Sequence, residues 1–517
     1  MSHIISRREF LTSVCCSSPL LSILARPVQG AVRRHLKFTE PPFQLGVASG
    51  DPAADGFVIW TRLAPKPLDG GGMPDDLVEV AWEVATDDKM AHVVRGGSTV
   101  ATPQLAHSVH EEIDGLESDR WYWYRFKVGT EISPIGRART MPKTSAEPDR
   151  LKFAFASCQH YEHGYYTAYQ HMVRENLDLL IHLGDYIYEG GAQKNGVRQH
   201  IGGELITLDQ YRNRYAQYKT DEDLQAAHAA CPWLVTWDDH EFDNNYANDI
   251  SEQPNIDVNA FLKRRADAYQ AFYEHMPLRR RSIPRGPDMR VYQQVAFGRL
   301  ANFFVLDTRQ YRTDQPNNDG LKPLVGAVFD PKATILGKRQ RKWLTSGLLK
   351  SQSTWNVLPQ QVLIAPVDRI PGDEDLFTMD KWAGYDFERQ RLMQFFHDRR
   401  VPNPIVLSGD IHTNFVNDLK LDFDNMKSPT VGVEFVGTSI TSGGNGTRKL
   451  SYTDGMLAEN RFMRFHNAER GYVSCTITPK EWRSDYQVMK TVTQRKSALI
   501  TRASFVVEDG KPGAERV

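Results

Sequence analysis

The chain has 517 residues, enough for two or more domains with sizeable hydrophobic cores. Its 63 basic and 64 acidic residues nearly balance and form no long basic stripe, which argues against a nucleic-acid-binding surface. Hydrophobic residues make up 40% of the chain and charged residues 25%, an ordinary globular composition that argues against a disordered protein.

Residues 1–31 combine a basic opening, an apolar middle and a small-residue end, which is the pattern of an export signal. Within them, "SRREFL" resembles the bacterial twin-arginine signal, so we expect the twin-arginine export machinery as a partner and a periplasmic or secreted protein. An ordinary secretory leader and a short amphipathic helix are the alternatives. Cleavage is expected near Ala31, with Ala25 as the second choice, and the apolar stretch is too short for a stable membrane span.

Removal of this leader would leave three cysteines, Cys158, Cys231 and Cys475. An odd number of cysteines in an exported protein leaves at least one thiol unpaired, so we expect a free or metal-bound cysteine. The sequence leaves open whether Cys231 and Cys475 form a disulfide or are buried and inert.

Residues 40–145 are predicted to form a small β-sandwich domain. The segments "FVIWTRL", "VEVAWEV" and "RWYWYRFKV" alternate apolar and polar residues and are rich in aromatic and β-branched side chains. Clusters of Gly, Pro and Asp separate them, and "IDGLESDRWYWYRF" resembles part of a fibronectin-type sandwich. The alternative is an extension of the main sheet of the protein. "TMPKTSAEPDR" is the expected linker to the next domain.

Residues 150–510 are predicted to form a second, larger domain of the α/β (α+β) class. Short apolar runs that end in polar or acidic residues alternate with helix-like segments such as "DVNAFLKRRADAYQAFYEHM" and "FERQRLMQFFHDRR". Near-continuous apolar strands between helices indicate a sheet that is covered on both faces. Functional groups in such sheets gather beyond the carboxyl ends of the strands. Near the C-terminus, "YVSCTIT" and "EWRSDYQVM" predict a hairpin that closes the same domain.

Four of the predicted strand ends carry side chains that can bind metal ions. In chain order they supply Cys158; Asp185 and Tyr188; Asp238, Asp239, His240 and Glu241; and Asp410 and His412. Carboxylates and phenolate suit trivalent iron or calcium, imidazole suits transition metals, and a metal ion deprotonates a bound thiol. One carboxylate can bridge two ions about 3.5–4 Å apart, which hold the attacking and leaving oxygens of a phosphoryl displacement. We therefore prefer a pair of metal ions to a simple hydrogen-bond network.

The segments "SCQ", "HLGDYIYE", "TWDDHE" and "LSGDIH" together resemble the PhoD-like alkaline phosphatases, which belong to the metallophosphatase superfamily with the purple acid phosphatases. The resemblance covers nearly the whole chain after the leader. It implies a four-layer metallophosphatase sandwich preceded by a small immunoglobulin- or fibronectin-like β-sandwich. It also implies an exported phosphohydrolase that cleaves phosphomonoesters, and phosphodiesters as well, by metal-activated hydroxide.

For the first metal site, the resemblance implies that Asp185 bridges two ions and that Cys158 and Tyr188 bind iron(III) beside it. Bound iron would give the protein a visible colour from charge transfer between phenolate and metal.

For the second site, the resemblance implies that Asp239 is a ligand, at the position where purple acid phosphatases use Asn. His240 would hydrogen-bond the phosphate or protonate the leaving group, and Asp410 and His412 would complete the two sites, with the ion that each serves left open. Purple acid phosphatases have His-x-His at the latter positions, and their other metal histidine has no clear match near "NVLPQQVLIAP". More oxygen and less nitrogen favour calcium over zinc or a second iron, so Fe(3+) and Ca(2+) are the expected cofactors.

Several neighbouring residues have two interpretations. Asp238 is a ligand or supports a loop, and Arg309 clamps a phosphate or forms an ion pair with Asp307 or another acid. The preferred interpretation is a turn position for Asn245 and Asn248. For His160, His163 and His182 it is an ordinary surface or core position.

Two other functions remain as alternatives. A phospholipase or nucleotide phosphodiesterase of the same superfamily would use the same site, because specificity depends on loops such as "GGAQKNGVRQHIGGEL". An inert cell-surface binding module would use the sandwich domain alone, and the complete set of donors at the strand ends counts against it.

Overall fold

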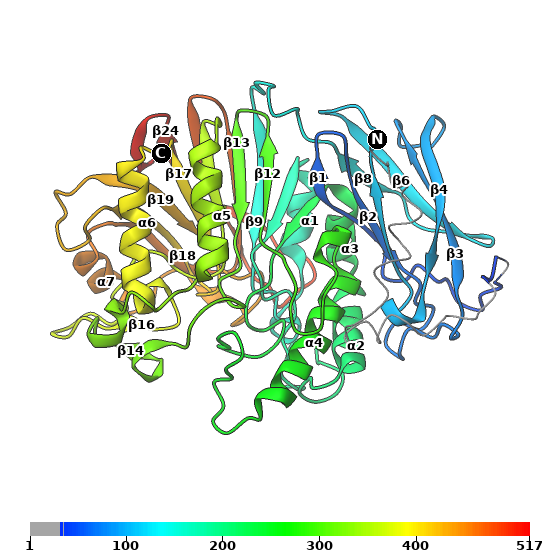
Figure 1. Ribbon diagram of the computed structural model, residues 1–517, viewed down its shortest axis with the longest axis horizontal. Helices are drawn as coiled ribbons and strands as arrows, with labels where there is room; N and C mark the ends of the chain where they lie inside the picture. Colours follow the sequence, from blue (N-terminus) through cyan, green and yellow to red (C-terminus); the bar gives the residue numbers. More distant parts are fainter. Residues whose placement is uncertain (1–31, 35) are drawn as a thin grey trace, which may run out of the picture.

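The computed structural model describes residues 32–34 and 36–517. Figure 1 shows two large sheets at the centre of the molecule, with helices beside them and a smaller sheet at the N-terminal side. The leader predicted for residues 1–31 lies outside the described residues, so its assignment remains a prediction. In the part of the chain that is described, no helix is long and apolar enough to cross a membrane.

The first large sheet has ten strands and joins N-terminal and C-terminal parts of the chain. In spatial order its strands are β25 (Lys511–Arg516), β24 (Leu499–Glu508), β23 (Glu481–Met489), β22 (Gly471–Ile477), β9 (Leu151–Ala156), β10 (Leu179–His182), β11 (Trp233–Val235), β1 (Val47–Ala53), β2 (Gly56–Arg62) and β5 (Ser108–Ile113). The four strands β9, β10, β11 and β1 run parallel, so their carboxyl ends share one edge. The antiparallel pair β22 and β23 is the predicted hairpin.

The second large sheet has eight strands. In spatial order they are β12 (Gln293–Phe297), β13 (Ala301–Val305), β15 (Trp355–Pro359), β17 (Pro404–Ser408), β19 (Thr430–Val436), β18 (Asn414–Lys420), β21 (Met463–Glu469) and β20 (Gly446–Thr447). Strands β13, β15, β17 and β19 run parallel. A separate two-stranded ribbon pairs β14 (Leu321–Lys322) with β16 (Phe377–Thr378).

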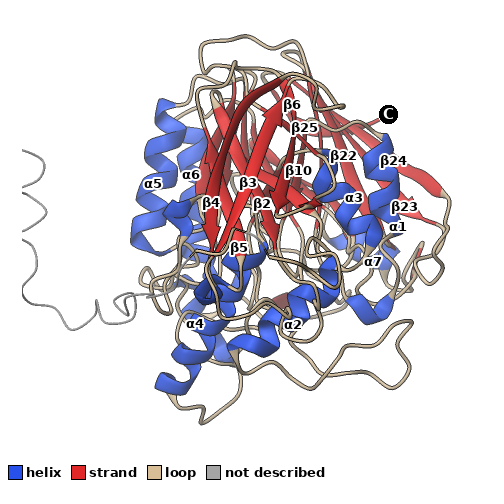
Figure 2. Ribbon diagram, turned by 90° about the vertical axis from the view of Figure 1, so that its right-hand side faces the viewer, coloured by secondary structure: helices blue, strands red, loops and turns tan. Residues whose placement is uncertain are grey.

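Helices cover the outer face of each large sheet. On the ten-stranded sheet they are α1 (Thr167–Arg174), α2 (Leu208–Lys219), α3 (Glu222–Ala230) and α4 (Val258–His275). On the eight-stranded sheet they are α5 (Gly337–Lys350), α6 (Asp386–Asp398) and α7 (Thr453–Glu459). Figure 2 shows the strands between α5 and α6 on one side and α1 and α3 on the other. A hydrophobic cluster between the sheets completes the predicted four-layer sandwich, so the fold class is confirmed.

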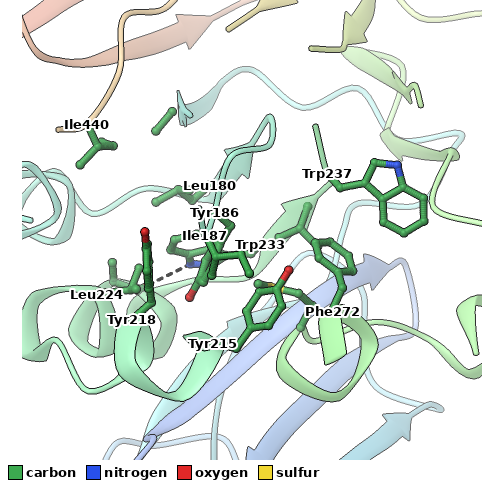
Figure 3. Close-up of a cluster of buried hydrophobic side chains, with 14 of the residues drawn as sticks. Leu180, Tyr186, Ile187, Tyr215, Tyr218, Leu224, Trp233, Trp237, Phe272 and Ile440 are labelled. Atoms are coloured by element: carbon green, nitrogen blue, oxygen red, sulfur yellow. Dashed lines mark hydrogen bonds between the residues drawn. The ribbon is translucent and has the colours of Figure 1, made fainter. Parts of the chain in front are cut away.

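The helix layer on the ten-stranded sheet is built largely from aromatic side chains. Tyr215 of α2 and Phe272 of α4 lie beside Trp233 and Trp237 in Figure 3. The Phe272 ring packs edge-on against Trp237, with centroids 5.4 Å apart. The helix α4 begins where the sequence predicts, because the Asp257 side chain caps its first turn. These contacts support the turns that follow β10 and β11 from the helix side of the sheet.

The N-terminal sandwich has its own small sheet. Its strands are β4 (Val93–Ala101), β3 (Val78–Ala85), β6 (Trp121–Val128) and β7 (Glu131–Ile132), with β8 (Gly136–Arg139) also paired to β6. The facing sheet consists of β1, β2 and β5, which continue the ten-stranded sheet through the pairing of Gly50 with Trp233. The structure therefore combines both alternatives, since a sandwich core forms over an extension of the main sheet. This continuity covers the edge of β11, which would otherwise present unpaired backbone groups.

Candidate functional site

The predicted ligands lie just beyond strand ends. Cys158 follows β9, Asp185 follows β10 and Asp239 follows β11 in the ten-stranded sheet, whereas Asp410 follows β17 in the eight-stranded sheet. Because the two sheets pack face to face, donors from both sheets meet at the shared edge. Their donor atoms form three groups, each with its members within 4.8 Å of one another.

The turns that carry these ligands have unusual backbone conformations. Four predicted ligands have positive φ angles, namely Cys158 (59°), Asp185 (55°), Asp410 (64°) and His412 (58°). The left-handed region costs a residue with a side chain about 1–2 kcal/mol, and such strain gathers at functional sites. Gly184 shows how closely the turns pack, because a Cβ there would lie 2.5 Å from the backbone nitrogen of Asp238. Only glycine fits this position.

The first group of donors joins Cys158, Asp185 and His412. The hydroxyl of Tyr188 donates a hydrogen bond to Asp185 Oδ2 at 2.8 Å and lies 3.3 Å from His412 Nε2. The sequence left open which site His412 serves, and the structure brings it to the thiol and the phenol. A thiol, a phenol, a carboxylate and an imidazole therefore converge here.

The second group shares Asp185 with the first, and the third shares Asp239 with the second. Asp185 also lies with Asp239 and His240, and Asp239 lies in turn with Asp238 and Asp410. Asp185 and Asp239 each belong to two groups, so the three groups form one continuous set of donor residues. The last group contains carboxylates alone, and it includes Asp238, whose role the sequence left open.

Two buried oxygens in this set of donor residues indicate that the set accommodates cations. Asp185 Oδ1 and Asp239 Oδ1 are buried, and neither has a hydrogen-bond partner among the described residues. An ionised oxygen in this position is costly unless a positive charge satisfies it. The donor types agree, since thiol, phenol and imidazole suit a transition metal and carboxylates suit a hard cation. The residues present fit a metal centre.

The pKa values of the first group describe the site without a cation. Burial raises the pKa of the Cys158 thiol well above its ordinary value, and the charge of Asp185 adds to the shift. Burial likewise raises the pKa of the Asp185 carboxyl and of the Tyr188 phenol. A bound cation favours the ionised forms, so metal binding to this group releases protons.

A fully buried arginine offsets much of the acidic charge. Arg309 lies 2.5 Å from Asp238, 2.7 Å from Asp380, 3.4 Å from Asp410 and 3.5 Å from Asp239. Burial opposes its charge, but these carboxylates outweigh burial and keep the pKa of Arg309 well above its ordinary value. The structure thus favours the ion-pair interpretation of Arg309 over the phosphate clamp.

A second cation, Lys381, joins the carboxylate group from a segment that the sequence did not single out. Its Nζ pairs with Asp410 and lies 3.1 Å from Asp380 Oδ2. Both Asp380 and Lys381 follow the two-residue strand β16, where no apolar run marks a strand end. Asp380, Lys381 and Arg309 together determine the net charge around the carboxylate group. Burial raises the pKa of Asp239, but the charges of Arg309 and His240 together outweigh this effect and lower the pKa to about 2.

His240 lies at the edge of the set of donor residues, with 23% of its side chain exposed. Its Nδ1 is 2.7 Å from Glu189 Oε2, and its ring centroid lies 4.2 Å from that of Tyr188. Burial opposes protonation, but the charges of Glu189 and Asp185 outweigh burial and raise the pKa of His240 well above its ordinary value. The histidine is therefore a proton-holding group beside the shared carboxylate.

Glu241, the last residue of "TWDDHE", supports the backbone of the site. Its carboxylate accepts the N–H groups of Asp185 at 3.0 Å, Tyr186 at 2.5 Å and Asp238 at 2.8 Å. Burial raises its pKa to about 8. Glu241 thus ties the turn after β10 to the turn after β11.

Ser442 is a supporting residue that no pattern in the sequence indicated. Its hydroxyl lies 2.7 Å from both the Tyr188 hydroxyl and the Cys158 carbonyl oxygen. Asn245 takes the expected turn role, with a φ of 49° and its N–H donating to Asp239 Oδ2 at 2.8 Å. Both contacts orient predicted ligands from outside the ligand set.

A fourth group, His160, Glu162 and His200, lies beside the site. The rings of His160 and His200 are stacked, with centroids 5.1 Å apart and planes at 23°. Nitrogen lone pairs lie in the ring planes, so stacked rings do not direct them at one ion. Both nitrogens of His200 also have partners, the Gly190 carbonyl at 3.0 Å and the Tyr218 hydroxyl at 3.1 Å. This group anchors the neighbouring loop.

All three cysteines of the described chain are buried and free. The prediction of at least one unpaired thiol is confirmed, and Cys231 and Cys475 do not pair. Burial raises the pKa of Cys231 to about 12, and it raises that of Cys475 as well. Of the three, Cys158 alone lies among potential metal ligands.

Known proteins resemble this chain along nearly its whole length. A family model described as PhoD-like phosphatase matches residues 153–486, and one for the N-terminal domain of PhoD-like phosphatases matches residues 29–142. Alkaline phosphatase D of Bacillus subtilis (strain 168) is 53% identical over 485 residues, which cover 93% of this chain and 83% of that protein. A solved structure of PhoD matches with a TM-score of 0.91 and 52% identity, covering 93% of each chain. The resemblance predicted from the sequence is confirmed, and the chain belongs to the PhoD-like phosphatases, a family of phosphate-ester hydrolases.

Proposed function

We propose that this phosphohydrolase is an exported enzyme of the alkaline phosphatase D type, which cleaves phosphomonoesters and also phosphodiesters with Fe(3+) and Ca(2+) as cofactors. One observation carries the proposal. The carboxylate of Asp185 belongs to two donor groups, and its Oδ1 has no hydrogen-bond partner within the described chain. A carboxylate shared in this way can bridge two cations, which is the arrangement that two-metal phosphoryl transfer uses.

Cys158, Tyr188 and His412, together with Asp185, are the residues that would hold iron(III). Phenolate and carboxylate are hard donors, and the imidazole adds a nitrogen that transition metals accept. Burial lowers the pKa of His412 to about 3, so its ring is neutral and its lone pair is available to a metal. The grouping of His412 with Cys158 supports its assignment to this ion.

Asp239 and Asp410, together with Asp185, are the residues that would hold calcium. Their donors are carboxylate oxygens, which calcium prefers. Arg309 and Lys381 pair with the same acids, and their charges allow several carboxylates to remain ionised while buried.

The residues of the chain also prepare the ester for cleavage. Bound cations would lower the pKa of a water molecule and offset negative charge on the phosphate. Lys381, with 12% of its side chain exposed, would attract the anionic ester to the site. His240 would donate a proton to the leaving oxygen, because its ring is partly exposed and lies beside the shared carboxylate.

Export through the twin-arginine machinery, to the periplasm or beyond the cell, is proposed on the motif "SRREFL" alone. Proteins cross by this route already folded, which suits a chain that binds its metals before export. The expected substrates are small phosphate esters.

The test replaces the shared carboxylate. Asp185→Asn should lose both metal ions and at least about 1,000-fold in turnover, since catalysis by bound cations depends on it. Elemental analysis and turnover on a panel of phosphomonoesters and phosphodiesters measure the two effects. The matched control is Asp51→Asn, a buried acid that accepts from Arg279 and Gln293 away from the site, and it should retain both properties.

Two results would contradict parts of this proposal. Full activity and metal content in Asp185→Asn would remove the bridging role. A colourless, iron-free wild-type protein with full activity would overturn the iron assignment.

A further inference from the structure

Glu189 is a buried glutamate that the ligand set leaves unexplained. It follows Tyr188 in the turn after β10, and 9% of its side chain is exposed. Its Oε2 lies 2.7 Å from Nδ1 of His240, which belongs to the turn after β11. Two turns from neighbouring parallel strands meet in this contact.

The carboxylate of Glu189 is held at both oxygens. Its Oε1 accepts the N–H of Asn244 at 2.9 Å, so a rotation of the carboxylate would break at least one contact. The ring of His240 also packs against Tyr188, with centroids 4.2 Å apart and planes at 34°. A carboxylate at Nδ1 and an aromatic ring at the face together restrict the imidazole to one orientation.

This orientation leaves the second ring nitrogen for a substrate. An imidazole that donates its Nδ1–H to a carboxylate has Nε2 available for other partners. His240 shares a donor group with Asp185 and Asp239, and its partly exposed side chain is accessible from solvent. An ester that enters the site can therefore meet Nε2.

We propose that Glu189 is the positioning residue for proton transfer to the leaving group, an inference that rests on the proposed function. Glu189 holds the Nδ1–H of protonated His240 so that Nε2–H faces the leaving oxygen. As an oxygen from water forms a bond to phosphorus, the bond between phosphorus and the leaving oxygen breaks, and its electron pair goes to the leaving oxygen, which takes the proton from Nε2. His240 is left neutral, with Nδ1–H still on Glu189, and water restores the proton. Glu189 acts through the histidine and touches neither ester nor cation.

A purely structural tie between the two turns would give a different kinetic pattern. A weakly basic leaving group such as 4-nitrophenolate departs without a proton, whereas an alkoxide needs one. Loss of a structural tie slows both esters by the same factor. Loss of a positioned proton donor slows the alkyl ester selectively.

The experiment compares Glu189→Gln with the wild-type holoenzyme on 4-nitrophenyl phosphate and on an alkyl phosphate. We expect kcat to fall about 100-fold on the alkyl ester and less than about threefold on the nitrophenyl ester. KM and the metal content measured by elemental analysis should not change. The double variant Glu189→Gln/His240→Asn should be no slower than His240→Asn alone, because the two residues act as a unit.

Glu162→Gln is the matched control. Glu162 is a buried glutamate that accepts the N–H groups of Gln193 at 2.8 Å and His200 at 3.0 Å, and its Oε2 lies 3.3 Å from His200 Nδ1. It has the same kinds of contact as Glu189 but does not reach His240. Any effect of this variant should be the same factor for both esters.

The inference is overturned if Glu189→Gln slows both esters equally or if its effect adds fully to that of His240→Asn. In that case selective loss of the alkyl ester in His240→Asn would still support the proposed function. Full activity and metal content in Asp185→Asn would instead remove the bridging role on which the proposed function depends, so the two failures are distinguishable.

Discussion

Arg309 and Lys219 are both buried basic residues, yet their surroundings change the pKa values of the two side chains in opposite directions. Arg309 has no exposed side-chain surface and lies among four carboxylates at the edge of the two sheets. Lys219, the last residue of α2, is 1% exposed and lies over the ring of Trp60 in the N-terminal sandwich, 4.3 Å from its centroid. The pKa of Arg309 is raised by its neighbours, whereas burial lowers the pKa of Lys219 to about 7.

The difference shows which surroundings allow a buried side chain to remain charged. At the proposed metal site, each buried charge is stable because opposite charges surround it, so the stability of each charge depends on its partners. At the sandwich, an aromatic ring replaces the carboxylates, and the amine becomes neutral near physiological pH because burial penalises its charged form. A site that binds cations and phosphate needs the first kind of environment.

Replacing each cation by methionine should give the largest contrast. Arg309→Met leaves four carboxylates without their shared partner, and we expect a loss of about 3–5 kcal/mol in the free energy of unfolding. Lys219→Met, measured at pH 10.5, should change this free energy by less than about 1 kcal/mol, because the amine is then neutral in the folded chain and at its ordinary pKa in the unfolded chain. Urea denaturation measures both. Equal losses in the two variants would show that the carboxylates do not distinguish the sites.

Removal of metal ions should affect one of these regions alone. A cation that binds only the folded chain adds about 2.7 kcal/mol when its concentration is 100 times its dissociation constant. We therefore expect a chelator to lower the free energy of unfolding of the wild type by about this amount, and of Lys219→Met equally. Asp185→Asn should show almost no further loss. An equal loss in Asp185→Asn would mean that the cations bind outside the proposed centre.

The effect that is smallest per pH unit concerns the pH dependence of stability. Between the folded pKa of Lys219, about 7, and its ordinary value of 10.5, the unfolded chain binds a proton that the folded chain does not. Stability from this residue therefore rises with pH across that window, by at most about 1.4 kcal/mol per pH unit. Urea denaturation from pH 7 to pH 10 should show this rise in the wild type relative to Lys219→Met. Parallel curves for the two proteins would contradict it.

The sequence predicted most of the donors because each is marked locally. Cys158, Asp185 and Asp239 follow apolar runs, and the parallel arrangement of such strands brings their ends to one edge. Asp380 and Lys381 carry no such mark, since they follow a strand of two residues. Ser442 acts through a contact with Tyr188, which is far from it in the sequence. Glu189 acts through a contact with His240 in a neighbouring turn. No local pattern marks either contact.

The N-terminal sandwich shows the same limit of prediction from the sequence. Alternating apolar residues predicted its strands, and the buried pattern of β6 agrees with them. Alternation does not specify which neighbour a strand pairs with, so the continuity of β1 with β11 could not be read from it.

The amino-acid sequence by itself determined the class of the fold, the succession of strands and helices along the chain and the chemical types of the predicted ligands, because apolar periodicity and short motifs are local properties. The tertiary structure alone decided which donors share a group, which cations balance the acids and which glutamate holds His240. Those outcomes depend on the packing of two sheets whose strand ends are far apart in the chain. Burial there strengthens each charge interaction, so small differences in placement decide the role of each residue.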